Sequence, residues 1–246
     1  MDILKRELAP ISGEAWEEID HEAARVLNTL LTAREFVDKP EPKGWDFAAI
    51  SKGTISIPKN TNKRDINYGI FDIQPLVEIR VPFYLNQFEL DNISRGLEDV
   101  DLTQMEKAAL RVAQFENDAV FKGFSEGNIK GLKNNSENKA LKIDHNMDNF
   151  INHVTSGLSM LKKNFVEGPY SLVVNHDLWK KIHSKVNHYP LRKSLIDILG
   201  GRIILNVSTD ENYLITERGG DFVFTNGIDL SIGYEDHTSK EVKLYF

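Results

Sequence analysis

Few residues of this 246-residue sequence stand at spacings that support catalysis. The sequence has neither the G-x-S-x-G turn that presents a nucleophilic serine nor the H-E-x-x-H pair that holds zinc. It also lacks the glycine-rich loops that cradle phosphates. Because it has no cysteine, disulfides, cysteine-ligated zinc and a cysteine nucleophile are excluded. By chemistry alone, the sequence predicts no enzyme and no metal site.

Four weaker patterns have more ordinary explanations. Residues 144–149 resemble a calcium loop, but the glycine and the glutamate that such a loop needs are missing, which favours a capped helix start. His176 and His183 would share one helix face without a third ligand. Residues 217–221 are typical of a β-turn fixed by an ion pair. A last group of acidic residues could supply paired carboxylates, but acidic residues beside a helix start are typically caps and dipole partners: Glu89, Asp91, Glu98, Asp99 and Asp101.

Composition indicates an ordinary globular protein, with 41% apolar and 27% charged residues. The net charge of −7 argues against nucleic acid as the main partner, since phosphate binding needs a concentrated basic surface. The apolar runs are too short to span a membrane, and no secretory signal follows Lys5 and Arg6. We therefore expect a cytoplasmic protein with no nucleic-acid or membrane partner.

The elements that must position any site alternate between helices and strands. Ser12 should cap a helix over residues 13–34, and Thr103 with Glu106 should form a capping box for a helix that ends near residue 123. Between them, short strands and polar loops predict an extended arm or hairpin. Further helices are expected over residues 149–161, 177–186 and 191–199, and strands over residues 170–175, 203–207, 213–216, 222–225, 230–234 and 242–246. The pattern predicts an α+β protein.

Nine motifs, in order along nearly the whole chain, resemble the family 1 encapsulins, bacterial and archaeal shell proteins also known by the older linocin or bacteriocin name. The motifs are LKRELAPI (residues 4–11), W-x-x-I-D (16–20), AREFVD (33–38), GW (44–45), FELDNI-x-RG (88–96), EGPY (167–170), HYPL (188–191), ERGGDF (217–222) and DLSIGYED (229–236).

This resemblance implies the major-capsid fold of tailed phages. Its parts would be an N-terminal helix with the start of a P-domain (1–49), an E-loop (50–80), a P-domain with a spine helix (81–132), an A-domain (133–220) and a return to the P-domain (221–246). Such a protomer would assemble into an icosahedral nanocompartment of about 60 or more copies. The family's final strand is missing after Phe246, so we expect an open strand edge there.

The resemblance also implies a groove for the C-terminal targeting peptide of a cargo enzyme. The cargo would be a ferritin-like iron oxidase for iron storage or a dye-decolorising peroxidase. The groove would be lined by Leu27, Leu31, Arg34, Phe36, Val37 and Asp38, opposite Asp229, Leu230 and Ile232. The alternative is that these residues only hold the helix to the sheet.

Two further sites come from the same resemblance. The fivefold pore would be surrounded by Asn187, His188 and Tyr189, where a ring of histidines would titrate. Phe88 takes the place of a tryptophan that binds flavin in some encapsulins. Phenylalanine can stack but lacks the indole N–H, so we expect no cofactor.

Two other functions stay open. A phage or prophage capsid protein would share the fold but would enclose DNA, which calls for a basic lumen rather than a peptide groove. A secreted bacteriocin or protease would show a nucleophile with its base and a secretion signal, and the sequence shows neither.

Overall fold

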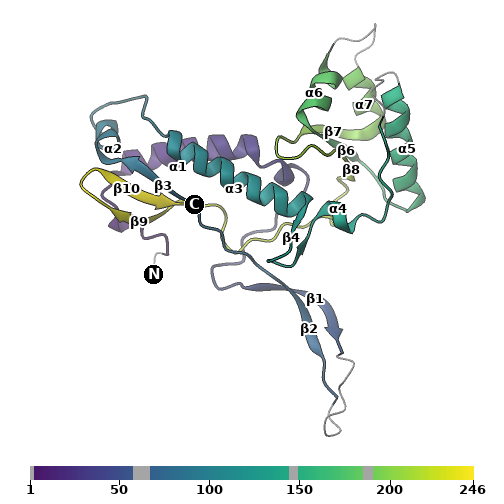
Figure 1. Cartoon of the computed structure of the whole chain (residues 1–246), viewed down its shortest axis with the longest axis horizontal. Helices are drawn as coiled ribbons and strands as arrows, with labels where there is room; N and C mark the ends of the chain where they lie inside the picture. The colour runs from purple at the N-terminus through teal and green to yellow at the C-terminus, as the bar shows by residue number, and fades with distance from the viewer. Residues whose placement is uncertain (1–2, 58–66, 144–148, 185–190) are drawn as a thin grey trace.

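The protein, described here from a computed structural model, consists of two lobes and a projecting β-hairpin (Figure 1). The structure describes residues 3–57, 67–143, 149–184 and 191–246.

Lobe 1 comprises α1 (Gly13–Leu30), α2 (Gln87–Ile93), α3 (Thr103–Phe121) and the sheet of β3 (Pro82–Asn86), β9 (Gly233–His237) and β10 (Glu241–Tyr245). Lobe 2 comprises α5 (Phe150–Lys163), α6 (His176–His183), α7 (Leu191–Leu199) and the sheet of β6 (Tyr170–Val174), β7 (Gly200–Leu205) and β8 (Tyr213–Thr216). The shorter elements are η1 (Arg6–Leu8), η2 (Thr32–Glu35), β4 (Gly123–Phe124), β5 (Ile129–Lys130) and α4 (Leu132–Asn135).

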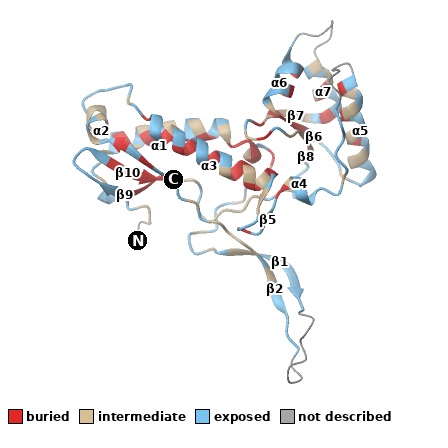
Figure 2. Ribbon diagram, in the orientation of Figure 1, coloured by how far each residue is buried: buried red, intermediate tan, exposed pale blue. Residues whose placement is uncertain are grey.

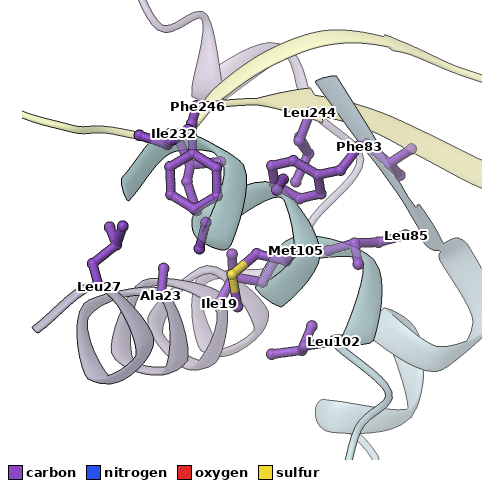
Figure 3. Packing of buried hydrophobic residues seen from close by; sticks show 14 of the residues in the cluster. Ile19, Ala23, Leu27, Phe83, Leu85, Leu102, Met105, Ile232, Leu244 and Phe246 are labelled. Carbon is purple, nitrogen blue, oxygen red and sulfur yellow. The ribbon is translucent and has the colours of Figure 1, made fainter. Parts of the chain in front are cut away.

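The core of lobe 1 lies between the two long helices and the sheet (Figure 3). The apolar face of α1 buries Ile19, Ala23 and Leu27, which recur every four residues and so fall on one side of the helix. From α3, Met105 reaches the same core, and the sheet contributes Leu244. Ser12 caps α1 as predicted, since its Oγ accepts from the backbone N–H of Ala15 at 3.2 Å.

Two helix ends differ from the sequence prediction. The predicted capping box of α3 is wrong, because the Oδ1 atom of Asp101 accepts from the N–H of Thr103 at 3.0 Å instead. The helix predicted over residues 13–34 stops at Leu30 and continues as the 3-10 turn η2. In this turn the backbone N–H of Ala33 donates a hydrogen bond to the side chain of Asn117 in α3, at 3.1 Å from its Oδ1 atom.

The last strand, β10, lies in the centre of its sheet, antiparallel to β3 on one side and to β9 on the other. The expected open edge at this strand is therefore wrong. Val242 and Leu244 are fully buried, and Phe246 exchanges backbone hydrogen bonds with Val81 at 3.1 and 3.2 Å. Partners from earlier in the chain satisfy the strand.

Lobe 2 is built around β6, a five-residue strand buried along its whole length. It pairs in parallel with β7 and antiparallel with β8. Beyond lobe 2, the strand predicted over residues 222–225 is reduced to one bridge between Asp38 and Val223, and the strand predicted over 230–234 begins only at Gly233. The return path to lobe 1 is thus an irregular segment.

The projecting hairpin pairs β1 (Ala49–Ser56) with β2 (Ile70–Pro75) and has two unlike faces. On one face, Asp72 accepts hydrogen bonds from Thr54 and Ser56, both at 2.7 Å, and these bonds lower the pKa of the Asp72 carboxyl. Ile55 pairs with Phe71 on the other face, where Phe71 is 70% exposed. Among the described residues, neither strand has a buried side chain, and the hairpin stands in solvent (Figure 2).

A polar side chain joins the two lobes. Asn117 of α3 is fully buried; besides bonding Ala33, its Nδ2 donates to the Leu30 carbonyl at 2.8 Å and to Ser208 Oγ at 3.1 Å. Ser208 belongs to the segment between β7 and β8. One amide thus fixes the end of α1 and ties it to lobe 2.

Asn117→Ala should lower the free energy of unfolding by about 3 kcal/mol, because it leaves the buried N–H of Ala33 and the partly buried carbonyl of Leu30 without their partner. The matched control is Ser208→Ala, which removes one of the three bonds and should cost about 1 kcal/mol. Urea unfolding followed by circular dichroism measures both. Equal costs for the two variants would contradict the role assigned to Asn117.

Candidate functional site

A hollow of about 860 Å³ opens between α3, the base of the hairpin and the irregular segment that returns to lobe 1. Its volume is in the range of sites that bind small molecules or short peptide segments. The walls are mainly apolar and aromatic, and they include Phe36, Val37, Phe115, Phe222, Phe224 and Leu230. Because no single element supplies these walls, the hollow exists only in the folded chain.

A buried ion network forms the polar wall of the hollow. Arg34, in η2, donates from Nε and Nη2 to both carboxylate oxygens of Glu116 at 2.7 Å, and from Nη1 to Asp229 at 2.6 Å. The side chains of Arg34 and Glu116 are only 13% and 8% exposed, whereas that of Asp229 is 53% exposed. Burial alone would lower the pKa of Arg34, but the hydrogen bonds and charges of Glu116 and Asp229 raise it above its ordinary value.

This network fixes the direction of the guanidinium. The fork geometry with Glu116 is bidentate, which is the strongest arrangement for an arginine and a carboxylate. The Arg34 guanidinium also lies over the ring of Phe224, 5.2 Å from its centroid. Arg34 therefore offers a ligand no free positive charge, and the exposed member of this network is the Asp229 carboxylate.

Asp38 holds the turn formed by residues 217–221. Its Oδ2 accepts from the N–H of Gly220 at 2.5 Å, and its backbone bonds to Phe222 and Phe224 at 2.8 and 2.9 Å. Gly219 and Gly220 have φ values of 86° and 80°, which glycine adopts without strain.

The ion pair predicted within the turn is confirmed. Arg218 donates to the carboxylate of Asp221 at 2.6 and 2.8 Å, and this bond lowers the pKa of Asp221. The turn therefore has an ion pair of its own as well as the bond from Asp38.

The nine residues predicted for a peptide groove divide into three groups. Five of them line the hollow: Arg34, Phe36, Val37, Asp229 and Leu230. Leu27, Leu31 and Ile232 are instead buried in the core of lobe 1, and Figure 3 shows Leu27 and Ile232 pointing into it. These three hold the helix to the sheet, while Asp38 bonds the turn.

Sequence reasoning missed Glu116 and most of the aromatic wall. Glu116 follows Val112 by four residues on the apolar face of α3. A charged residue on such a face signals a buried partner of opposite charge, so this residue could have been found. Phe115 and Phe224 carry no comparable signal, because neither one's own segment shows that the two meet across a hollow.

The other predicted sites lie elsewhere. Phe88 is in the first turn of α2, 62% exposed and outside the hollow, and its N–H donates to Asn86 at 2.9 Å. Asn187, His188 and Tyr189 lie outside the described residues, as do residues 144–148. His183 bonds the Trp179 carbonyl at 2.9 Å. Within the described ranges no group of three or more histidine, aspartate or glutamate residues could hold a metal ion, and no helix is long and apolar enough to cross a bilayer.

The two lobes, the long helix α3 and the protruding hairpin define a class, that of proteins with the α+β capsid fold. A crystal structure of a virus-like particle from Pyrococcus furiosus superposes with a TM-score of 0.66 and 16% identity, over 93% of this chain and 90% of that one. The family model for an encapsulating protein for peroxidase matches residues 1–246. The chain therefore belongs to the encapsulin shell protein family, and the predicted fold class and resemblance are confirmed.

Curated relatives agree with this assignment. The type 1 encapsulin shell protein of Rhodococcus erythropolis is 36% identical over 247 residues, covering all of this chain and 93% of the relative. That of Mycobacterium tuberculosis is 35% identical over 246 residues and is covered to 92%. The relative from Rhodospirillum rubrum is 36% identical and is covered to 90%. The chain is a shell protein by family, and proteins of this kind form multimers.

Proposed function

We propose that this chain assembles into a closed icosahedral shell in the cytoplasm and encloses a cargo enzyme, while performing no catalysis itself. One observation carries the proposal: the hairpin projects from the body and exposes the apolar side chains of Ile55, Phe71 and Ile73 on one face. A two-stranded hairpin is marginally stable by itself in water. Burial of this face against a second copy would stabilise both the hairpin and the shell.

Closed icosahedral symmetry predicts the mass of the particle. The simplest icosahedral shell contains about 60 copies of one chain. At 28.0 kDa per copy, that shell has a mass of about 1.7 MDa. Size-exclusion chromatography with light scattering, followed by electron microscopy, should show hollow particles of this mass or of a larger icosahedral number. A monomer or dimer at micromolar concentration would refute the proposal. Particles filled with DNA, seen as excess absorbance at 260 nm, would favour a capsid protein instead.

The hollow supports the loading of cargo through a short peptide. A partly apolar groove with one oriented charge can anchor side chains and fix the direction of an extended segment. Here the apolar wall is formed by residues such as Val37 and Leu230, and the exposed carboxylate of Asp229 lies beside them. The proposed cargo is a peroxidase, because the family that the chain belongs to is that of an encapsulating protein for peroxidase, and a ferritin-like protein is the second candidate.

Leu230→Gln should reduce the cargo bound per shell about tenfold, because it replaces an apolar contact of the hollow with a polar side chain. The matched control is Leu110→Gln, which changes a 39% exposed leucine outside the hollow and should leave loading unchanged. Each variant is co-expressed with a dye-decolorising peroxidase and, separately, with a ferritin-like protein. Cargo is then measured in the purified particles by denaturing gel. Undiminished loading in Leu230→Gln would place the peptide outside this hollow.

A further inference from the structure

Phe165, directly after α5, is the most exposed large apolar residue described, at 88%. Its backbone φ is 61°, in the left-handed region that residues other than glycine rarely enter. An aromatic residue at such a position combines a strained backbone with apolar surface in water. The other strongly exposed phenylalanines, Phe71 and Phe88, are 70% and 62% exposed and lie in a regular strand and a regular helix.

Two backbone hydrogen bonds hold Phe165 in this conformation. The N–H of Phe165 donates to the Lys162 carbonyl at 3.1 Å, and the N–H of Val166 donates to the Leu161 carbonyl at 3.0 Å. These two bonds define the helix-ending motif whose left-handed position is usually glycine. Leu161 and Val166 both pack against the core of lobe 2, which completes the motif. Because the chain before and after Phe165 is fixed, its ring is held outward.

The chain directly before Phe165 is basic. Lys162 and Lys163 precede this residue and are exposed, and Arg218 donates to the Phe165 carbonyl at 3.5 Å. Residues 133–220 contain 12 lysines and arginines against 9 aspartates and glutamates, a net charge of +3. Since the whole chain carries −7, the remaining residues carry −10. The part of a second copy outside residues 133–220 is therefore net acidic, opposite in sign to the two lysines before Phe165.

We propose that Phe165 is an assembly contact that inserts into the acidic part of a second copy, formed by residues outside 133–220. The inference rests on the proposed self-assembly and names one of its contacts. Within one chain, glycine at this position would relieve the strain and remove exposed apolar area. A phenylalanine at this position is stabilising only where another molecule buries its ring. The opposite net charges of the two parts of the chain identify that molecule as a second copy.

Phe165→Gly separates the backbone strain from the burial of the ring, because it should stabilise the single chain and weaken the shell. The unassembled chain should melt about 2–4 °C higher, as relief of the strained backbone predicts. The concentration at which half of the chain is in particles should rise about tenfold or more, since each copy loses one buried aromatic contact. Differential scanning fluorimetry and light scattering on the full chain measure the two effects.

The matched control is Asn128→Gly, which changes another left-handed residue, with φ of 55°, and removes no aromatic ring. Its half-assembly concentration should stay within twofold of the unmodified chain. If the unmodified chain does not assemble, the proposed function fails. If it assembles and Phe165→Gly assembles equally well, only the present inference is overturned.

A photo-crosslinking phenylalanine analogue at position 165 tests the partner surface directly. Irradiated particles should yield a dimer on a denaturing gel, with the crosslinked peptide coming from residues outside 133–220. A crosslink within one chain, or to residues 133–220 of the second copy, would contradict the proposed surface.

Discussion

A chain with aspartate in place of Phe71 should fold and remain unassembled, with the concentration for half-assembly raised about a hundredfold or more. The Phe71 side chain is 70% exposed in the single chain, so the substitution removes little of what holds the fold together. In a shell the same position would be buried against another copy. There the aspartate would lose the aromatic contact and would also place a charge in an apolar interface, which adds several kcal/mol.

The measurement is size-exclusion chromatography with light scattering, and far-UV circular dichroism checks that Phe71→Asp is folded. Phe71→Leu is the matched control, since it keeps an apolar side chain on the same face of the hairpin and should still assemble. Particles of normal mass from Phe71→Asp would show that assembly does not depend on the apolar face of the hairpin.

Arg34→Met should have the second large effect, a loss of about 3–5 kcal/mol in the free energy of unfolding. The substitution keeps much of the side-chain volume but leaves the carboxylate of Glu116, only 8% exposed, without its bidentate partner. An uncompensated buried charge is costly, whereas the exposed Asp229 can be solvated by water. The unfolding is best followed in urea in the Phe71→Asp background, so that assembly does not contribute.

Two controls separate the ion pair from packing. The double variant Arg34→Met with Glu116→Met should recover most of the loss, because replacing both charges with apolar side chains is often close to neutral. Asp229→Asn should cost about 1 kcal/mol or less, since its side chain is 53% exposed. A loss below 1 kcal/mol for Arg34→Met would mean that the Glu116 carboxylate is accommodated without Arg34.

This result bears on how cargo loading is tested. Arg34 and Asp38 appear in the sequence as two charges of opposite sign, suited to anchoring a peptide. The structure gives both an intramolecular partner, Glu116 for Arg34 and the N–H of Gly220 for Asp38. Reversal of either charge would therefore disturb the fold as well as any ligand. Lining residues outside these networks, such as Leu230, are better probes of the hollow.

Local periodicity made much of the fold predictable from the sequence. The cap at Ser12, the buried face of α1 and the apolar face of α3 follow from side-chain spacing and short-range hydrogen bonding, which involve residues three or four apart. The ordered motifs shared with the encapsulin family, and the lack of any catalytic pattern, likewise depended on the sequence alone.

Tertiary structure alone decided the site and the position of the last strand. Arg34 meets Glu116 and Asp229 across separations of 82 and 195 residues, and Asp38 reaches Gly220 across 182. The alternation in residues 242–246 predicts a strand but not that β3 and β9 enclose it. Such pairings depend on how distant segments pack together, and side-chain periodicity within a segment carries no information about its partner.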